Sequence, residues 1–239
     1  MLIFIDKRAP ETARQTLRKY GEVVEFSTKG IVYEAISGHP DIFMCQTPET
    51  VVVAPNIPAE FLAVLDNNHI NFVFGKNPVG IKYPETAIYN AVVTEKYLVH
   101  NITFSDPVIL NVEEKKQIIP VKQAYTRCNL LFLNENAAIT SDKGIEKQLA
   151  AFGVRTLFVD PAGVELPGFK HGFFGVRVVF RKIRFSSLES YRIIIRAIKL
   201  WILLKKRDSQ SPNFMMVNFL MVAGYFYYKK IRFVLIIYL

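Results

Sequence analysis

Cysteine is scarce in this chain of 239 residues, which contains only Cys45 and Cys128. Two distant cysteines provide neither a disulfide framework nor the spacing of a metal site, so we expect two reduced thiols in the core and no metal. There is no phosphate loop, zinc pattern or Ser-His-Asp signature, and no cofactor is expected. No signal peptide is expected, because Asp6 directly follows the short apolar run Leu2–Ile5. The expected location is therefore cytoplasmic.

Acidic residues, glycine and proline are nearly missing from the C-terminal part of the chain. Val176–Leu239 has 13 Lys or Arg against two Asp or Glu, with one glycine and one proline of the 12 that the chain has of each. Met1–Gly175 has 17 basic and 19 acidic residues. The net charge of +9 therefore belongs to the tail, and its distribution argues against a nucleic-acid partner. The sequence divides into a domain over residues 1–175 and an unrelated basic, apolar tail over residues 176–239.

What the first 175 residues do have is a recurring hairpin pattern. Two segments, "YNAVVTEKYLVHN" (Tyr89–Asn101) and "CNLLFLNENAAIT" (Cys128–Thr140), align without gaps at an offset of 39. Each has two β-rich runs around a polar turn, and "DIFMCQTPETVVVAP" (Asp41–Pro55) is a looser copy. A helical pattern and one more strand follow each hairpin. The repeating unit is therefore ββαβ, with starts near residues 41, 90 and 129, and we expect the three hairpins to superpose.

The elements outside the hairpins are predicted from apolar periodicity and from start and stop signals. The predicted strands are Leu2–Ile5, Glu22–Phe26, Ile70–Phe74, Gln117–Val121 and Arg155–Val159. The predicted helices are Pro10–Tyr20 and Pro58–Asn68, and two more that begin after the N-cap pairs Ser105-Asp106 and Ser141-Asp142.

A repeat of this length indicates an array or a propeller, and the helix in the unit excludes an ordinary four-stranded blade. The pattern resembles the pentein or GME fold, in which five ββαβ units surround a pseudo-fivefold axis. The segments "SGHPDIFMC", "VVVAPNIP", "GIKYPETAIYNAVV" and "GFKHGFFG" are similar to an uncharacterised bacterial GME-fold family, over residues 1–175. The expected fold is therefore α/β, an incomplete pentein-like β/α-propeller. The alternative is an ordinary α+β domain with coincidental hairpins.

The tail admits three interpretations. Ser186-Ser187-Leu188-Glu189 is a capping box that would begin a long helix ending near Arg207. The apolar run Asn213–Tyr228 is shorter than the about 20 residues of a membrane span. The first interpretation is a peripheral or integral membrane anchor in residues 176–239, which is also the alternative localisation. The second is a basic helix that lies on a membrane surface. The third is a shift of the reading frame after Gly175.

The genetic code allows the frame shift to be examined directly. Met215-Met216 must be encoded by ATGATG, whose shifted codon GAT specifies Asp, and the two Met-Val pairs shift to Gly codons. The free codon positions permit "ELYDGELFDGGGIF" over Pro212 to Phe226, and this string resembles the segment with which members of the GME-fold family end. We therefore expect the tail to be a shifted version of a soluble repeat, poorly packed and weakly anchored at its ends.

The resemblance implies a chemistry that this chain lacks in part. Penteins include arginine deiminases, dimethylarginine hydrolases and amidinotransferases, in which a Cys thiolate attacks a guanidinium carbon, a His is the acid and base, and carboxylates hold the guanidinium. The fold also hosts non-catalytic ribosome-binding members. The nucleophile lies late in penteins, and no Cys follows Cys128 here. The chain as given is expected to be inactive. The alternatives are a non-catalytic binding protein and a membrane-associated protein.

Seven residues are candidates for a site. His171, in "GFKHGFFG", is the candidate acid or base. The substrate-binding candidates are Asn90, Asn129, Glu85, Asp160, His39 and Asp41. Each also has a simpler interpretation as a loop, turn or strand-end residue. Cys128 takes the place of Tyr89 in the repeat, which favours packing over nucleophilic attack. A small-molecule ligand is the expected partner, and the sequence sets no oligomeric state.

Overall fold

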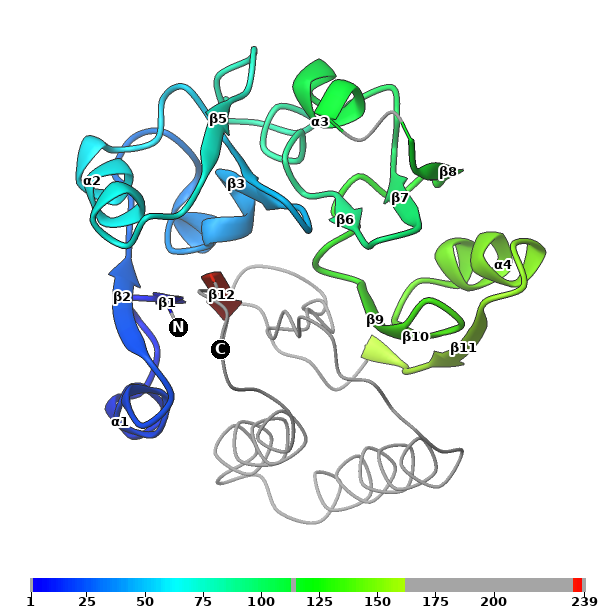
Figure 1. The fold of residues 1–239 in the computed structure, drawn as a ribbon, viewed down its shortest axis with the longest axis horizontal. Coiled ribbons are helices and arrows are strands. Elements are labelled where there is room, and N and C mark those ends of the chain that lie inside the picture. The colour runs from blue at the N-terminus through cyan, green and yellow to red at the C-terminus, as the bar shows by residue number, and fades with distance from the viewer. Residues whose placement is uncertain (1, 113–114, 162–233, 238–239) are drawn as a thin grey trace.

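The computed structural model describes residues 2–112, 115–161 and 234–237. In these ranges the protein is a mixed α/β structure with four small three-stranded sheets and few helices. The four sheets follow one another around an arc, with the helices α1 to α4 on its outer side (Figure 1). The described residues form neither a closed barrel nor a closed ring. The candidate His171 and the helix predicted from Ser186 lie outside the described ranges.

The first sheet joins the beginning of the chain to its end. Its strands are β1 (Leu2–Asp6), β2 (Glu22–Phe26) and β12 (Val234–Ile237), with helix α1 (Glu11–Arg18) between the first two. The central strand β1 runs parallel to both neighbours and is buried along its whole length. A continuous apolar run of this kind is typical of a strand covered on both faces.

The three predicted ββαβ units are confirmed, including each of the three hairpins. The first unit is β3 (Met44–Gln46), β4 (Val51–Val53), α2 (Ala59–Asn67) and β5 (Phe72–Phe74). The second is β6 (Val92–Val93), β7 (Tyr97–His100), α3 (Pro107–Val112) and β8 (Gln117–Pro120). The third is β9 (Leu130–Asn134), β10 (Ala137–Thr140), α4 (Lys143–Ala151) and β11 (Arg155–Phe158). In each unit the second strand is central, antiparallel to the first strand and parallel to the last.

Local sequence signals explain where the helices begin and end. Asp142 caps α4, its carboxylate accepting a 2.9 Å hydrogen bond from the backbone N of Ile145. Asp106 does the same for α3, with a 2.9 Å bond from the backbone N of Val108. After α4 the chain reverses at Gly153, whose φ of +75° is a conformation that glycine adopts without strain. Both N-caps predicted from the sequence are therefore confirmed.

The gapless alignment of the second and third hairpins is wrong in their second strands. Val92 pairs with Val99, whereas Leu131, its counterpart 39 residues later, pairs with Ile139 and not with residue 138. A register shift between Ala137 and Ala138 marks a bulge that adds one residue to the third hairpin. One extra residue leaves the ladder partly unpaired and bends the strand, so a sequence alignment does not reveal it.

Two short 3-10 helices were not predicted, and one of them changes the start of the first unit. Pro40–Ile42 forms the helix η2 and Glu34–Ile36 the helix η1, so Asp41 lies in a helical turn and β3 begins only at Met44. Proline lacks an N–H and has a φ that suits the first turn of a helix. Pro40 therefore favours a turn where the hairpin pattern predicted strand.

The end of the tail differs from the expectation that it is weakly anchored. Val234–Ile237 pairs with Leu2–Ile5 over four residues. In Figure 1, β12 takes the inner position of its sheet, as β3, β6 and β9 do in theirs, but it runs parallel to the central strand where they run antiparallel. β-Branched residues favour such a strand. The rest of the tail lies outside the described ranges.

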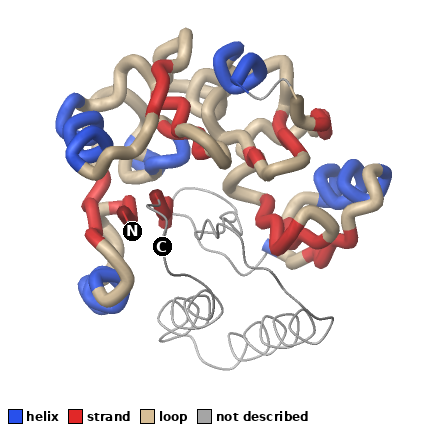
Figure 2. The backbone as a smooth tube through the Cα atoms, viewed as in Figure 1, coloured by secondary structure: helices blue, strands red, loops and turns tan. Residues whose placement is uncertain are grey.

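The core has two clusters of buried apolar side chains. The larger joins the first sheet to the first and second units and includes Phe4, Phe26, Phe43 and Phe61, whose rings contact one another. The smaller lies between the second and third units. Figure 2 shows that long loops connect the short strands. In the described residues no helix is both long and apolar enough to cross a membrane.

Candidate functional site

Three segments, one before each ββαβ unit, bring polar side chains into contact. Asp41 precedes β3, Asn90 precedes β6 and Cys128 precedes β9. The Cys128 thiol donates to Oδ2 of Asp41 at 3.3 Å, and Asn90 Nδ2 lies 3.5 Å from Cys128 Sγ. The backbone N of Cys128 donates to Oδ1 of Asn90 at 3.2 Å. We call these three residues the inter-unit cluster. It unites two predicted binding residues with a cysteine that the sequence assigned to packing.

The inter-unit cluster is withdrawn from solvent. Asp41 and Asn90 are at most 1% exposed and Cys128 is 6% exposed. Burial raises the pKa of the Cys128 thiol well above its ordinary value, and the neighbouring Asp41 carboxylate raises it further. The cysteine is therefore a neutral thiol that donates its proton to a hydrogen bond. The thiolate is the nucleophilic form of cysteine, so this arrangement disfavours attack on a substrate.

The second cysteine lies close to the same loops. Cys45, on β3, is buried and its thiol lies 3.9 Å from the carbonyl oxygen of Ala91, the neighbour of Asn90. Both cysteines are free and buried, which confirms the prediction of two core thiols. Burial alone makes a thiol poorly reactive.

Asn129 does not join the inter-unit cluster, although it matches Asn90 in the repeat. Its Nδ2 donates to the carbonyl oxygen of Tyr125 at 2.8 Å, and its Oδ1 accepts from the hydroxyl of Ser141 at 2.8 Å. Its backbone oxygen accepts from Thr140 Oγ1 at 2.7 Å. Asn129 therefore ties the start of its hairpin to the end, which is the structural role that the sequence left open.

His39 lies with a carboxylate that sequence reasoning missed. Asp6 ends β1, is 3% exposed, and has its Oδ2 3.9 Å from His39 Nε2. The Arg8 guanidinium binds the same carboxylate at 2.6 Å and also donates to the carbonyl oxygens of Glu34 and Ala35. Burial opposes ionisation of Asp6, but the hydrogen bonds from Arg8 outweigh it and hold the pKa of Asp6 below its usual value.

Asp6 could have been identified from the sequence, because it is the first charged residue at the end of a buried apolar strand. Polar residues at such strand ends commonly lie in functional or structural sites. Gly38 packs so closely on the Asp6 carboxylate that a Cβ at this position would overlap with it. The segment "SGHPDIFMC" therefore contributes to two separate groups. Gly38 and His39 contact Asp6, whereas Asp41 contacts Cys128.

The remaining candidates lie apart from both groups. Glu85 is exposed and its side chain lies over Gly80. Asp160 is exposed just after β11. The structure therefore does not bring these carboxylates to Asp41 and Asn90. His171 is not among the described residues, so its proposed role as acid or base stays a prediction.

Two further buried polar networks hold the second unit together. Asp106 accepts hydrogen bonds from the backbone N of Lys76 and Asn77 and from the hydroxyl of Tyr89. His100, at the end of β7, contacts the hydroxyl of Ser105 at 2.6 Å and the carbonyl oxygen of Ala124 at 2.8 Å. Burial lowers the pKa of His100 to about 4, so the ring is neutral at pH 7. These networks are satisfied and structural.

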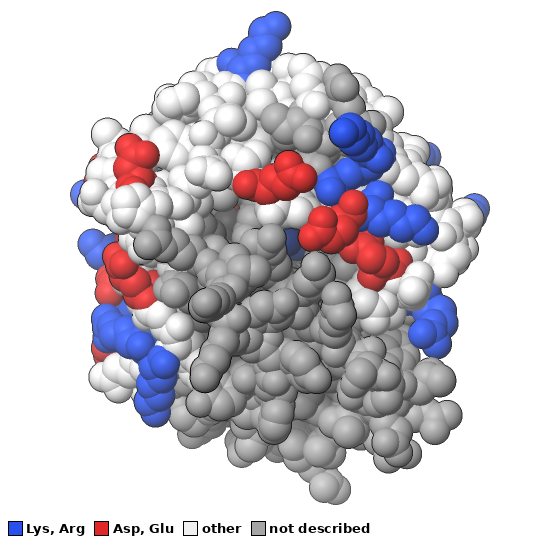
Figure 3. Space-filling model, in the orientation of Figure 1, with Lys and Arg blue, Asp and Glu red and all other residues white. Residues whose placement is uncertain are grey.

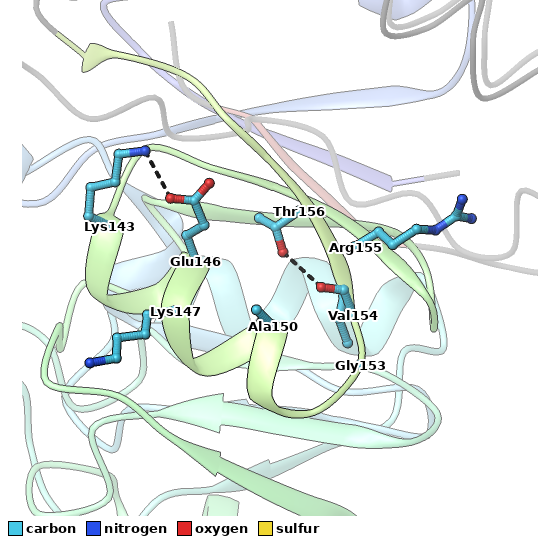
Figure 4. A pocket seen from close by; sticks show the side chains of 8 residues that line it. All are labelled: Lys143, Glu146, Lys147, Ala150, Gly153, Val154, Arg155 and Thr156. Atoms are coloured by element: carbon cyan, nitrogen blue, oxygen red, sulfur yellow. Dashed lines mark hydrogen bonds and ion pairs between the residues drawn. The ribbon is translucent and has the colours of Figure 1, made fainter.

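A surface hollow lies between α4 and β11, and its lining includes none of the predicted site residues (Figure 4). Its volume is ≈ 560 Å³ and its lining residues are Lys143, Glu146, Lys147, Ala150, Gly153, Val154, Arg155 and Thr156. In the close-up, Lys143 points to Glu146, and the pair is 2.9 Å apart, whereas Lys147 and Arg155 extend in opposite directions. The polar groups do not converge, so the hollow is a poor candidate for a ligand site.

On the described residues, neither the surface charge nor the metal-ligating side chains indicate a binding site. Acidic and basic side chains alternate on the face shown in Figure 3 and form no continuous basic patch there. No group of three His, Cys, Asp or Glu side chains in residues 2–112, 115–161 and 234–237 is placed to hold a metal ion.

The fold and the inter-unit cluster define a mixed α/β protein of repeated ββαβ units with a buried polar group where the units meet. The chain belongs to a family of unknown function, DUF6873, whose profile matches residues 4–179. The match covers all three units and ends close to the change in composition after Gly175. No curated protein matches the chain.

Proposed function

We propose that this chain is a pentein-like, GME-fold protein related to the guanidino-group-modifying hydrolases and amidinotransferases. We propose that it binds a small guanidine or amidine ligand and, as given, does not turn it over. The three ββαβ units support the fold assignment, because they share one strand order and carry their helices on the outer side of one arc. The functional part of the proposal depends on the inter-unit cluster.

The contact between Asp41 and Cys128 carries the proposal. A carboxylate recognises a guanidinium or amidinium group through charge-assisted hydrogen bonds, which are often bidentate. Asn90 lies beside it, with its amide oxygen accepting from the backbone N of Cys128 and its Nδ2 3.5 Å from Sγ. Burial first, and then the same carboxylate 3.3 Å from Sγ, raise the pKa of the Cys128 thiol and favour its protonated form. Covalent catalysis needs an activated nucleophile, so the cluster favours binding without reaction.

The test is a calorimetric titration with agmatine, a guanidine, and with butylamine as a cation that lacks the planar fork. We expect agmatine to bind the wild type more tightly than butylamine. Asp41→Asn removes the charge and should weaken agmatine binding by roughly 10- to 100-fold, because hydrogen bonds to charged groups contribute about 1.5–3 kcal/mol. Asp66→Asn makes the same change at an exposed position of α2 and should have no effect.

Two results would contradict the proposal. Equal affinity of the wild type and a folded Asp41→Asn variant, with folding checked by circular dichroism, would exclude this carboxylate from the site. Release of urea or citrulline from agmatine, arginine or methylarginines that Cys128→Ser abolishes would show that the thiol is a nucleophile after all.

We further propose that residues 176–239 are a frame-shifted remnant of a further repeat. The family match that stops at residue 179 supports this, as does a parallel β12 in the position where the repeats have an antiparallel strand. The coding DNA around Gly175 provides the test. A gene in which one inserted or deleted nucleotide restores an Asp- and Gly-rich ending should yield a more stable protein. An intact frame in independent clones would contradict the proposal.

A further inference from the structure

The strand β5 forms the outer edge of its sheet in the first unit, and it is apolar along its whole length (Figure 1). Its residues are Phe72, Val73 and Phe74, and among the strands that the structure describes none pairs with its outer side. Val73 is 38% exposed and Phe74 is 50% exposed. Free sheet edges pair readily with other strands, and proteins usually protect them with charged residues or proline. β5 has neither.

The other three outer strands carry such protection. β2 contains Glu22 and Glu25. β8 ends in Pro120, which has no N–H to donate, and β11 begins with Arg155. All four outer strands run parallel to the central strand of their sheet, so they differ in sequence and not in topology. This contrast within one chain indicates that β5 is the edge that a further strand covers.

The hydrogen bonds between β5 and β4 define which groups of β5 face outward. The backbone N of Gly75 donates to the carbonyl oxygen of Val53 at 2.8 Å, just beyond the end of the ladder. Alternate residues of a parallel strand bond to the same neighbour, so Val73 also directs its N–H and C=O groups to β4. The N–H and C=O groups of Phe72 and Phe74 therefore face the outer side, and they lie symmetrically about Val73.

We propose that this chain forms a symmetric dimer in which β5 pairs antiparallel with β5 of a second copy, around a two-fold axis at Val73. In this register Phe72 lies opposite Phe74 of the second copy, and each such pair exchanges both of its N–H···O bonds. The exposed side chains of Val73 and Phe74 lose solvent contact at the same time. The proposal is independent of the inter-unit cluster and of any ligand.

The charges at the two ends of β5 favour this antiparallel arrangement. Thr50 Oγ1 donates to the carbonyl oxygen of Asn71 at 3.1 Å, so the turn that contains the exposed Glu49 lies at the beginning of β5. The exposed Lys76 lies just beyond its end. An antiparallel pair places Lys76 of one copy at the Glu49 end of the other, whereas a parallel pair would place like charges together. A second copy therefore complements this edge in charge as well as in hydrogen bonding.

Sedimentation equilibrium of the whole chain tests the dimer. The wild type should show a monomer–dimer equilibrium. Val73→Lys places two like charges opposite each other at the axis and should raise the dissociation constant at least about tenfold, with folding checked by circular dichroism. Ile118→Lys makes a matched change on β8, where Ile118 is 42% exposed, and should leave the dimer intact. A wild type that stays monomeric, or a dimer that Val73→Lys does not weaken, would overturn the proposal.

An engineered disulfide tests the register without introducing a charge. At a non-hydrogen-bonded position of an antiparallel pair the Cα atoms are about 4.5 Å apart, which a disulfide can bridge. Val73→Cys should therefore give a covalent dimer with copper–phenanthroline and oxygen as the oxidant. In Asn71→Cys, the control, the two cysteines would lie roughly 13 Å apart along the strands and should not link. Failure of Val73→Cys to link, or equal linking of both variants, would overturn the proposed pairing.

Discussion

Arg8 and Asp6 show how a single ion pair organises two segments that are far apart in the sequence. Arg8 covers the buried carboxylate at the end of β1 and holds the carbonyl oxygens of Glu34 and Ala35 in η1. An isolated buried carboxylate would be unfavourable, and the guanidinium offsets that cost. The loop that contains His39 is therefore fixed to β1 by contacts from one residue.

Arg8→Gln should destabilise the protein by roughly 1–2 kcal/mol near neutral pH, a value reduced because half of the Arg8 side chain is exposed. The pKa of Asp6 is lowered in the folded state, so its contribution is complete above its unfolded pKa of about 4 and is lost as the pH falls through the folded value. Urea unfolding should show the difference in unfolding free energy between wild type and variant narrowing as the pH falls below about 4. Arg18→Gln, which loses an exposed pair with Glu11, is the control. A difference that is independent of pH would contradict this account.

The two thiols should be unreactive in the folded protein. Cys45 and Cys128 are buried, and burial together with Asp41 raises the pKa of Cys128. Ellman's reagent should therefore react slowly with the native chain. In urea, where the chain is unfolded, it should react with both thiols. Cys45→Ser and Cys128→Ser each remove one of the two. A fast thiol in the native protein that disappears only in Cys128→Ser would contradict a neutral, enclosed Cys128.

At the scale of elements, His100 links the end of β7 to the start of α3 and to the loop before β9. Its ring is neutral in the folded state because burial lowers its pKa to about 4. Unfolded His has a pKa of about 6.5, so between these values the unfolded chain binds the extra proton. Folding stability should therefore fall by up to about 3 kcal/mol as the pH drops from about 6.5 to 4.

His100→Gln should remove this component of the pH dependence, and His69→Asn is a control at an exposed position with positive φ. The test is the unfolding free energy of the wild type and of both variants, measured between about pH 6.5 and 4. A His100→Gln variant with the same slope as the wild type would show that another group titrates there.

Local elements were predictable because their signals are local. The β-rich runs on both sides of a polar turn predicted the hairpins around β7 and β10, and Asp106 and Asp142 predicted helix starts. The bulge before Ala138 and the helical turn at Pro40 were missed because the residues at both places also fit a strand pattern.

The site was predictable only as a set of candidates. Asp41 and Cys128 are 87 positions apart, and no periodicity places one against the other. Asn90 and Asn129 look equivalent in sequence, yet only Asn90 contacts the cysteine.

At the scale of the whole molecule, β12 covers the inner edge of β1. Ending the chain at Phe233 should expose that edge and increase hydrogen exchange at the amides of β1, because an uncovered strand loses its ladder on one side. Removing only residues 238–239 is the control. Unchanged protection of Leu2–Ile5 in the shorter chain would show that β12 contributes little to the first sheet.

The central claim is that Asp41 of the inter-unit cluster binds the cationic end of a guanidine ligand while Cys128 stays unreactive. A crystal structure of the chain soaked with arginine tests it most directly. We predict the guanidinium of the ligand at Asp41 and no covalent bond to Cys128. Arginine bound elsewhere, or no ligand at Asp41 at saturating concentration, would contradict the claim.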